Sequence, residues 1–143
     1  MLRGSCLCGA VAFEMDRTEG PFELCHCRRC RKVSGSGYLG TFRVPADAYR
    51  GVRGDDVVLH FALAVRDTPP AYAYDFCGRC GCVLPGLDAH AGVVEVPVGL
   101  IDDELGLRPD RHIFVEHRPG WDRDLDVLSH LTGDELRTLR ARG

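Results

Sequence analysis

The sequence predicts a mainly β fold, and three features support that prediction. Short runs rich in β-branched and aromatic residues recur along the 143 residues, separated by glycine and proline turns. No apolar run approaches the roughly 18 residues of a membrane-spanning helix. The clearest helix signal is a T-x-x-E capping box, Thr132 to Glu135, which opens a short helix over 132–140. We therefore expect one domain over residues 1–143, made of small sheets with a short C-terminal helix.

The expected strands share β-branched or aromatic side chains and end at turn residues. They cover residues 10–15, 38–44, 57–63, 72–76, 83–84, 93–98 and 112–116, with a short lead at 22–24 into the central cysteines. Pro45 closes the strand before it, because proline has no amide hydrogen for the sheet ladder. Turns are expected at 19–21 and at Pro69-Pro70, and short helical turns at 28–33 and 46–49.

The overall composition is typical of a globular protein and not of a nucleic-acid binder. Apolar residues make up 45% and charged residues 27%, and the formal net charge is −3. Residues 1–5 lead directly to Cys6 without an apolar h-region, so we expect no signal peptide and a cytoplasmic location. Eight cysteines in that compartment favour metal ligands or reactive thiols, with disulfides as the alternative. We expect small-molecule partners, no nucleic acid and no membrane, and the sequence indicates no oligomeric state.

The eight cysteines fall into three clusters. These are Cys6-x-Cys8, then Cys25-x-Cys27-x-x-Cys30, then Cys77-x-x-Cys80 followed by Cys82. A structural zinc site takes four ligands, so the two outer pairs suit one closed site of four thiolates. Gly9 is expected to let the chain turn tightly beside the first pair. Such a site would join the first strand to the second half of the chain, and metal binding would add on the order of 10 kcal/mol to folding.

The central triplet then remains for a second zinc ion with one vacant position. A vacant position is what a substrate or a water molecule needs in a catalytic site. The alternative is a closed site in which His26, His112 or Cys82 is the fourth ligand. His26 lies between two of the cysteines, and its side chain is expected to point away from them. Cys82 is alternatively a spare thiol or a small buried apolar residue.

The charge of the triplet indicates which chemistry it suits. Three thiolates on a divalent cation leave a net charge of about −1, which weakens the cation as a Lewis acid and favours capture of an incoming thiol. Four basic residues lie within and just after the triplet: Arg28, Arg29, Arg31 and Lys32. Their side chains suit the carboxylates of an anionic thiol such as glutathione, and the alternative is an ordinary solvated face.

Three cysteine motifs resemble one known family in sequence and order. Residues 4–11, 25–32 and 76–81 resemble the glutathione-dependent formaldehyde-activating enzyme family, and so does the late segment 112–114 followed by Trp121. The resemblance covers nearly the whole chain, from about residue 3 to residue 121. Cys82 departs from it, since a small or polar residue is expected after the C-x-x-C-G run.

The resemblance implies a fold, two zinc sites and a reaction. The fold is a β-tent of small antiparallel sheets. One structural zinc is expected on Cys6, Cys8, Cys77 and Cys80, and one catalytic zinc on Cys25, Cys27 and Cys30. The reaction adds glutathione to formaldehyde to give S-hydroxymethylglutathione, by attack of the metal-held sulfur on the aldehyde carbon, and is classed as a carbon–sulfur lyase in reverse. The sequence shows no obvious proton donor for the new hydroxyl group.

Other interpretations of the same residues are a non-catalytic zinc-stabilised scaffold of this fold, and a methionine sulfoxide reductase of type B. The reductases share the fold and a four-cysteine zinc, but the central thiols form a chelating triplet and the catalytic-cysteine signature is missing. His112 and Trp121 are interpreted as structural residues, a strand histidine and a core or rim aromatic.

Overall fold

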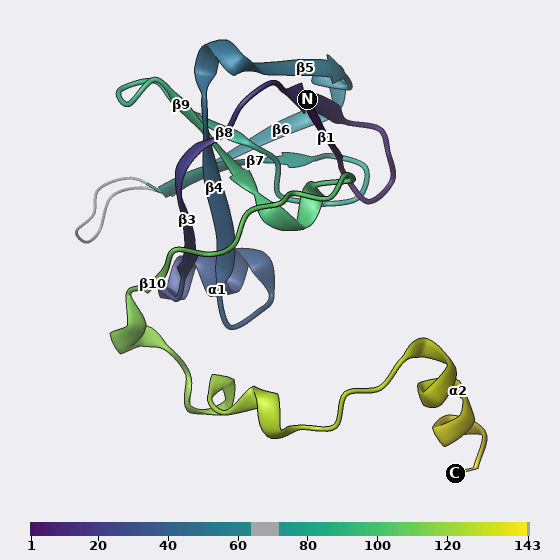
Figure 1. Cartoon of the computed structure of the whole chain (residues 1–143). Helices are drawn as coiled ribbons and strands as arrows, with labels where there is room; N and C mark the ends of the chain where they lie inside the picture. Colours follow the sequence, from purple (N-terminus) through teal and green to yellow (C-terminus); the bar gives the residue numbers. More distant parts are fainter. Residues whose placement is uncertain (64–71, 143) are drawn as a thin grey trace.

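The computed structural model describes residues 1–63 and 72–142 (Figure 1). Within these ranges ten strands form three small sheets and a short helix lies at the C-terminal end, so the prediction of a mainly β fold is confirmed. The turn expected at Pro69-Pro70 lies outside the described residues. No helix in the described ranges is long and apolar enough to cross a membrane.

The largest sheet has the strand order β10-β3-β4-β9-β8. Its strands are β3 (Glu19–Cys25), β4 (Leu39–Pro45), β8 (Gly86–Asp88), β9 (Val93–Pro97) and β10 (Arg111–Ile113). The pairs β3–β4, β4–β9 and β8–β9 are antiparallel, whereas β10 runs parallel to β3. Alternate residues of β4 and β9 point inward, and Phe42, Val44 and Val96 are fully buried. This sheet carries β3, which ends at the first cysteine of the central triplet.

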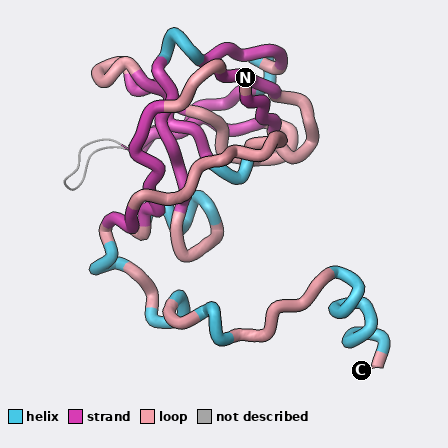
Figure 2. The backbone as a smooth tube through the Cα atoms, in the orientation of Figure 1, coloured by secondary structure: helices cyan, strands magenta, loops and turns pink. Residues whose placement is uncertain are grey.

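Two smaller sheets complete the β structure (Figure 2). One is β1-β2-β5, formed by β1 (Leu2–Ser5), β2 (Ala12–Met15) and β5 (Tyr49–Arg53), and the other pairs β6 (Val58–Leu63) with β7 (Tyr72–Cys77). Phe13 and Met15 of β2 pack into the main core with the buried residues of the large sheet. A second, smaller core contains Cys6, Val11, Cys77 and Leu84, so it lies around the outer cysteines.

Two α-helices lie in the described ranges. The helix α1 (Arg28–Ser34) follows β3 almost directly and ends at Gly35, whose φ of 64° is left-handed. The helix α2 (Gly133–Ala141) begins with the predicted capping box between Thr132 and Glu135. Short 3₁₀ turns occur at Ala46–Ala48, Asp55–Val57, Val98–Leu100, Val115–His117, Gly120–Asp122 and Leu125–Val127. The chain after β10 runs away from the sheets and ends in α2 (Figure 1).

Two local predictions were wrong in the first half and middle of the chain. The turn expected at 19–21 belongs to β3, whose pairing with β4 is interrupted between Glu19 and Glu23. The strand expected at 83–84 is reduced to one isolated bridge between Val83 and Phe76. The strands β1 and β5 were not predicted; β1 contains arginine, glycine and serine, which are weak strand formers.

The last expected strand, 112–116, is also shorter than predicted. It ends at Ile113 because Phe114 has a φ of 55°, a left-handed conformation that cannot continue a strand. A 3₁₀ turn at Val115–His117 follows. The short strand β10 pairs with β3 in parallel rather than antiparallel order, at the edge of the large sheet. Ile113 lies opposite Cys25, so the C-terminal segment begins beside the central cysteines.

Candidate metal centres

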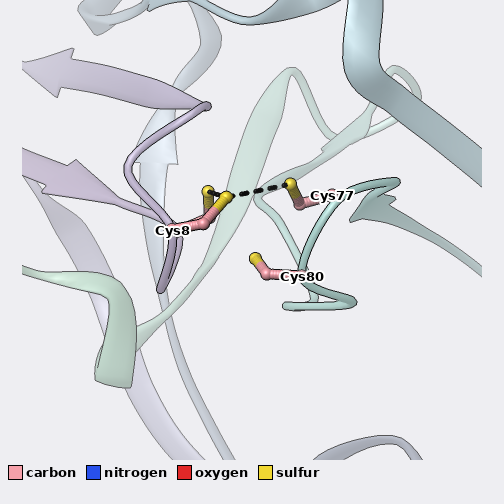
Figure 3. A group of neighbouring side chains, drawn as sticks. Cys8, Cys77 and Cys80 are labelled. Atoms are coloured by element: carbon pink, nitrogen blue, oxygen red, sulfur yellow. Dashed lines mark hydrogen bonds between the residues drawn. The ribbon is translucent and has the colours of Figure 1, made fainter.

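Four outer cysteines converge although 69 residues separate the two pairs. The sulfur atoms of Cys6, Cys8, Cys77 and Cys80 all lie within 4.8 Å of one another (Figure 3). The Sγ atoms of Cys6 and Cys8 are 3.6 Å apart, and those of Cys8 and Cys77 are 3.9 Å apart. Zinc–sulfur bonds of about 2.3 Å in a regular tetrahedron separate the sulfurs by about 3.8 Å, so this group fits one zinc ion. All eight cysteines are free.

The two pairs are held by similar turns. The amide of Gly9 donates to the carbonyl of Cys6 at 2.8 Å, and the amide of Gly81 donates to the carbonyl of Cys77 at the same distance. Both glycines are left-handed, with φ of 70° and 76°, a conformation that an L side chain would strain. The turn predicted at Gly9 is therefore confirmed.

Cys82 lies beside the four-sulfur group and not in it. Its Sγ accepts a hydrogen bond from the amide of Leu7 at 3.3 Å, and its carbonyl accepts one from the amide of Cys77 at 2.9 Å. Its own amide helps to lower the pKa of the Cys80 thiol to about 6, together with a backbone contact from Cys8. Cys82 thus connects the two turns.

The central triplet forms a second group. The sulfur atoms of Cys25, Cys27 and Cys30 lie within 4.8 Å of one another, and no further His, Cys, Asp or Glu joins them within the described ranges. Cys25 ends β3, Cys27 caps α1 by accepting from the amide of Cys30 at 3.3 Å, and Cys30 is buried in the first turn. A hydrogen bond between Cys25 and Cys30 lowers the pKa of Cys25 to about 6 and raises that of Cys30.

The four basic residues of α1 do not share one environment. Arg28 and Lys32 are exposed, while Arg29 and Arg31 are half-buried. The guanidinium of Arg29 lies over the ring of Tyr72, 5.0 Å from its centroid. The buried Nε of Arg31 has no hydrogen-bond partner within the described part of the chain.

Tyr72 is a neighbour of the triplet that the sequence did not reveal. Its hydroxyl oxygen lies 3.9 Å from Sγ of Cys30, although 42 residues separate them. Burial, together with the negative charge of Cys30, raises the pKa of this phenol. Tyr72, Tyr74 and Phe76 are alternate residues of one strand, so their rings lie on the same face. Nothing in the sequence indicates that this face meets α1.

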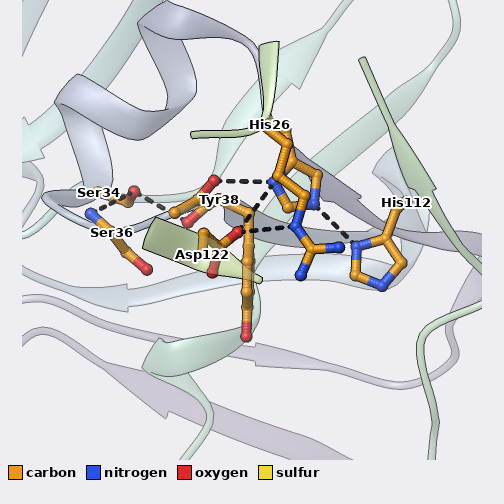
Figure 4. Close-up of polar contacts among 8 residues, drawn as sticks. His26, Ser34, Ser36, Tyr38, His112 and Asp122 are labelled. Atoms are coloured by element: carbon orange, nitrogen blue, oxygen red, sulfur yellow. Dashed lines mark hydrogen bonds and ion pairs between the residues drawn. The ribbon is translucent and has the colours of Figure 1, made fainter. Parts of the chain in front are cut away.

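The ring nitrogens of His26 face Gly37 and His112 (Figure 4), and His26 does not join the group of triplet sulfurs. The ring is fully buried, and burial lowers its pKa. In the neutral form Nδ1 donates to the carbonyl of Gly37 at 2.9 Å, and Nε2 accepts from Nδ1 of His112 at 2.8 Å. His26 therefore fixes the backbone between Cys25 and Cys27, and neither His26 nor His112 joins the group of three sulfurs.

A buried carboxylate joins this network from the C-terminal segment. Oδ2 of Asp122 lies 3.4 Å from Nδ1 of His26 and accepts from Nε of Arg118 at 3.2 Å. Asp122 is 3% exposed, whereas its neighbour Trp121 is 64% exposed. Of the two expected positions for Trp121, core or rim, this exposure excludes the core, and Asp122 is the residue that anchors this segment.

Replacing Gly37 by alanine is expected to displace Asp122. A Cβ atom at this position would meet Cγ of Asp122 at 2.5 Å, which requires the buried carboxylate to move. Overpacking of this kind costs roughly 1–3 kcal/mol, so thermal unfolding monitored by circular dichroism should show a lower midpoint. Gly120→Ala is the matched control, because nothing lies within 4 Å of its added Cβ. Equal midpoints for the two variants would contradict the prediction.

Comparison with known proteins gives a consistent result. The sequence model of the glutathione-dependent formaldehyde-activating enzyme family matches residues 1–117. A protein of Halomonas elongata, provisionally named a glutathione-dependent formaldehyde-activating enzyme, is 32% identical over 125 residues, which are 85% of this chain and 79% of that protein. A crystal structure of a Rhodobacter sphaeroides protein has a TM-score of 0.55 and 22% identity, covering 77% of this chain and 98% of that one. The last match supports the fold alone.

Proposed function

We propose, because the chain belongs to the glutathione-dependent formaldehyde-activating enzyme family, that it adds glutathione, or a similar small thiol, to formaldehyde or another small aldehyde. The observation that carries this proposal is the convergence of Cys25, Cys27 and Cys30 with no fourth ligand among residues 1–63 and 72–142. With glutathione and formaldehyde the product is S-hydroxymethylglutathione, and the reverse reaction is that of a carbon–sulfur lyase.

In this proposal the two cysteine groups hold two zinc ions with different roles. The closed group of four sulfurs holds a structural ion, and the group of three holds a catalytic one. A zinc ion on the triplet would supply the positive charge that keeps a bound thiol in its thiolate form near neutral pH. The chain itself fixes the three sulfurs, through the end of β3 and the start of α1, and His26 holds the intervening loop.

The basic side chains of α1 are proposed to bind the carboxylates of the thiol. Arg28 and Lys32 offer exposed cations beside the triplet, and Arg31 has a buried donor with no partner in the described ranges. Arg29 lies over the ring of Tyr72, so it contributes a positive charge on that side of the site. An anionic thiol is thereby favoured over a neutral one.

Replacing Arg31 by methionine is expected to raise KM for glutathione by about tenfold or more while changing kcat little. The side-chain stem is kept and one charge-assisted hydrogen bond is lost, which is typically worth 1.5–3 kcal/mol. Initial rates at varied glutathione concentration measure the change. Arg142→Met, near the C-terminal end, is the control, and an unchanged KM in the Arg31 variant would remove this residue from the site.

The proposed activity is tested by following the hydroxymethyl group at equilibrium. Glutathione and formaldehyde also combine without a catalyst, so NMR magnetisation exchange between free and sulfur-bound formaldehyde is the appropriate rate measurement. The exchange rate should increase in proportion to protein concentration. No increase with glutathione, cysteine or other small thiols would contradict the proposed function.

We also propose that the protein acts in the cytoplasm and that residues 1–143 form one zinc-binding domain. The support for the location is that seven of the eight cysteines form two groups suited to a metal ion, a use of cysteine typical of compartments where stable disulfides are rare.

A further inference from the structure

Tyr72 is the hydroxyl group that lies beside the central triplet. It comes from β7, and its oxygen is 3.9 Å from Sγ of Cys30. This separation is at the outer limit of an O–H···S contact, so the hydroxyl hydrogen is only weakly engaged by the protein. A phenol hydroxyl group is a hydrogen-bond donor.

The ring of Tyr72 is held in place from two sides. The guanidinium of Arg29 lies over one face, 5.0 Å from the centroid. The ring of Tyr74, two residues along the same strand, packs at 6.0 Å with an interplanar angle of 51°. These two contacts hold the ring, and Arg29 places a positive charge against it.

The other hydrogen-bonding side chains near the triplet are directed elsewhere. His26, although flanked by two of the cysteines, uses both ring nitrogens for contacts with Gly37 and His112. Asp122 is directed to His26 and Arg118. Among the described residues, Tyr72 is the neutral side chain from outside the triplet whose hydroxyl group contacts a triplet sulfur.

We propose that Tyr72 is a catalytic residue whose hydroxyl donates a hydrogen bond to the aldehyde oxygen during thiol addition. The inference rests on the proposed function and adds to it the group that stabilises the developing oxyanion. A molecule bound at the three sulfurs on the side of Cys30 that Tyr72 occupies comes within reach of this hydroxyl.

The step balances without an additional reactant. The thiolate sulfur forms a bond to the carbonyl carbon, and the π pair of the carbonyl moves to its oxygen. Tyr72 donates a hydrogen bond to that oxygen as its negative charge grows, and Arg29 stabilises the same charge. The oxygen then takes a proton from water, and the proton that the thiol released on ionising restores that water. In the reverse direction the same contact holds the hydroxyl group of the product.

Tyr72→Phe tests the proposal, with Tyr74→Phe as the matched control on the same strand. Tyr72→Phe should lower kcat by about 100-fold, the typical loss for one oxyanion donor, and leave KM for glutathione unchanged. Tyr74→Phe, which also loses only a hydroxyl group, should keep wild-type rates. Equal kcat in the two variants would overturn the proposal.

A binding measurement provides a readout that does not depend on turnover. Calorimetry should show that the wild type binds S-(2-hydroxyethyl)glutathione about two- to tenfold more tightly than S-ethylglutathione, because one hydrogen bond distinguishes them. Tyr72→Phe should abolish this preference, and Tyr74→Phe should keep it. A preference that survives in Tyr72→Phe, or a loss of zinc or of glutathione affinity in that variant, would assign Tyr72 a structural role and overturn the proposal. A wild type that fails to accelerate exchange would instead contradict the proposed function, and the inference would fall with it.

Discussion

Cys27→Ser is expected to remove one of the two proposed zinc ions and to lower the rate of thiol addition by more than about 100-fold. Cys27 holds the triplet together in two ways, as one of three converging sulfurs and as the cap of α1. Loss of a residue that merely orients a ligand costs 10–100-fold in metal affinity or activity, so loss of a ligand should cost more. The measurements are zinc content by elemental analysis and the exchange rate of formaldehyde.

The fold should survive this change, because the four-cysteine group is untouched. Cys82→Ser is the control: its sulfur accepts an amide hydrogen bond, which a serine hydroxyl can also accept, and both zinc ions should remain. Retention of both zinc ions by Cys27→Ser together with loss of a methionine sulfoxide reductase activity would support a redox thiol and would contradict the assignment.

Cys77→Ser is expected to have the largest effect on stability. Cys77 is completely buried and belongs to both the four-sulfur group and the smaller core. Structural zinc contributes on the order of 10 kcal/mol to folding, which is comparable with the whole stability of a typical domain. The variant should therefore be largely unfolded at 25 °C.

Circular dichroism and zinc content would measure this change, again with Cys82→Ser as the control. The order of zinc loss provides a second check. A chelator should remove the triplet ion first without unfolding the protein, and the sheets should unfold only when the second ion leaves. A folded Cys77→Ser protein that holds two zinc ions would show that the four outer cysteines are not one structural site.

The grouping of the cysteines could be predicted because it is local within each pair. A C-x-C or C-x-x-C turn brings its two sulfurs together whatever the rest of the chain does, and Gly9 signals the conformation that such a turn requires. Once the two outer pairs are assigned to one site of four ligands, the three central cysteines remain for a second site. The helix at 28–33 followed for the same reason, since three sulfurs at that spacing cannot all point to one side of a strand.

The residues that surround the triplet could not be predicted, because they arrive from distant strands. Tyr72 is 42 residues from Cys30 and His112 is 86 residues from His26, and both contacts depend on which strand edges meet. The parallel pairing of β10 with β3 brings His112 into place, and a strand of three residues has too short a pattern to indicate its partner. The burial of Asp122 follows from the packing of the C-terminal segment beside β3, and no sequence pattern around Asp122 indicates it.

The central claim is that the triplet leaves a position at which the sulfur of glutathione binds, and cobalt substitution tests it most directly. Cobalt(II) in place of zinc reports the number of bound thiolates through its sulfur-to-metal charge-transfer absorption. Addition of glutathione should increase this absorption until one equivalent per protein is bound, and S-methylglutathione, which has no thiol, should not. A spectrum that stays tetrahedral and unchanged in saturating glutathione would show a closed site and would favour a non-catalytic zinc-stabilised scaffold.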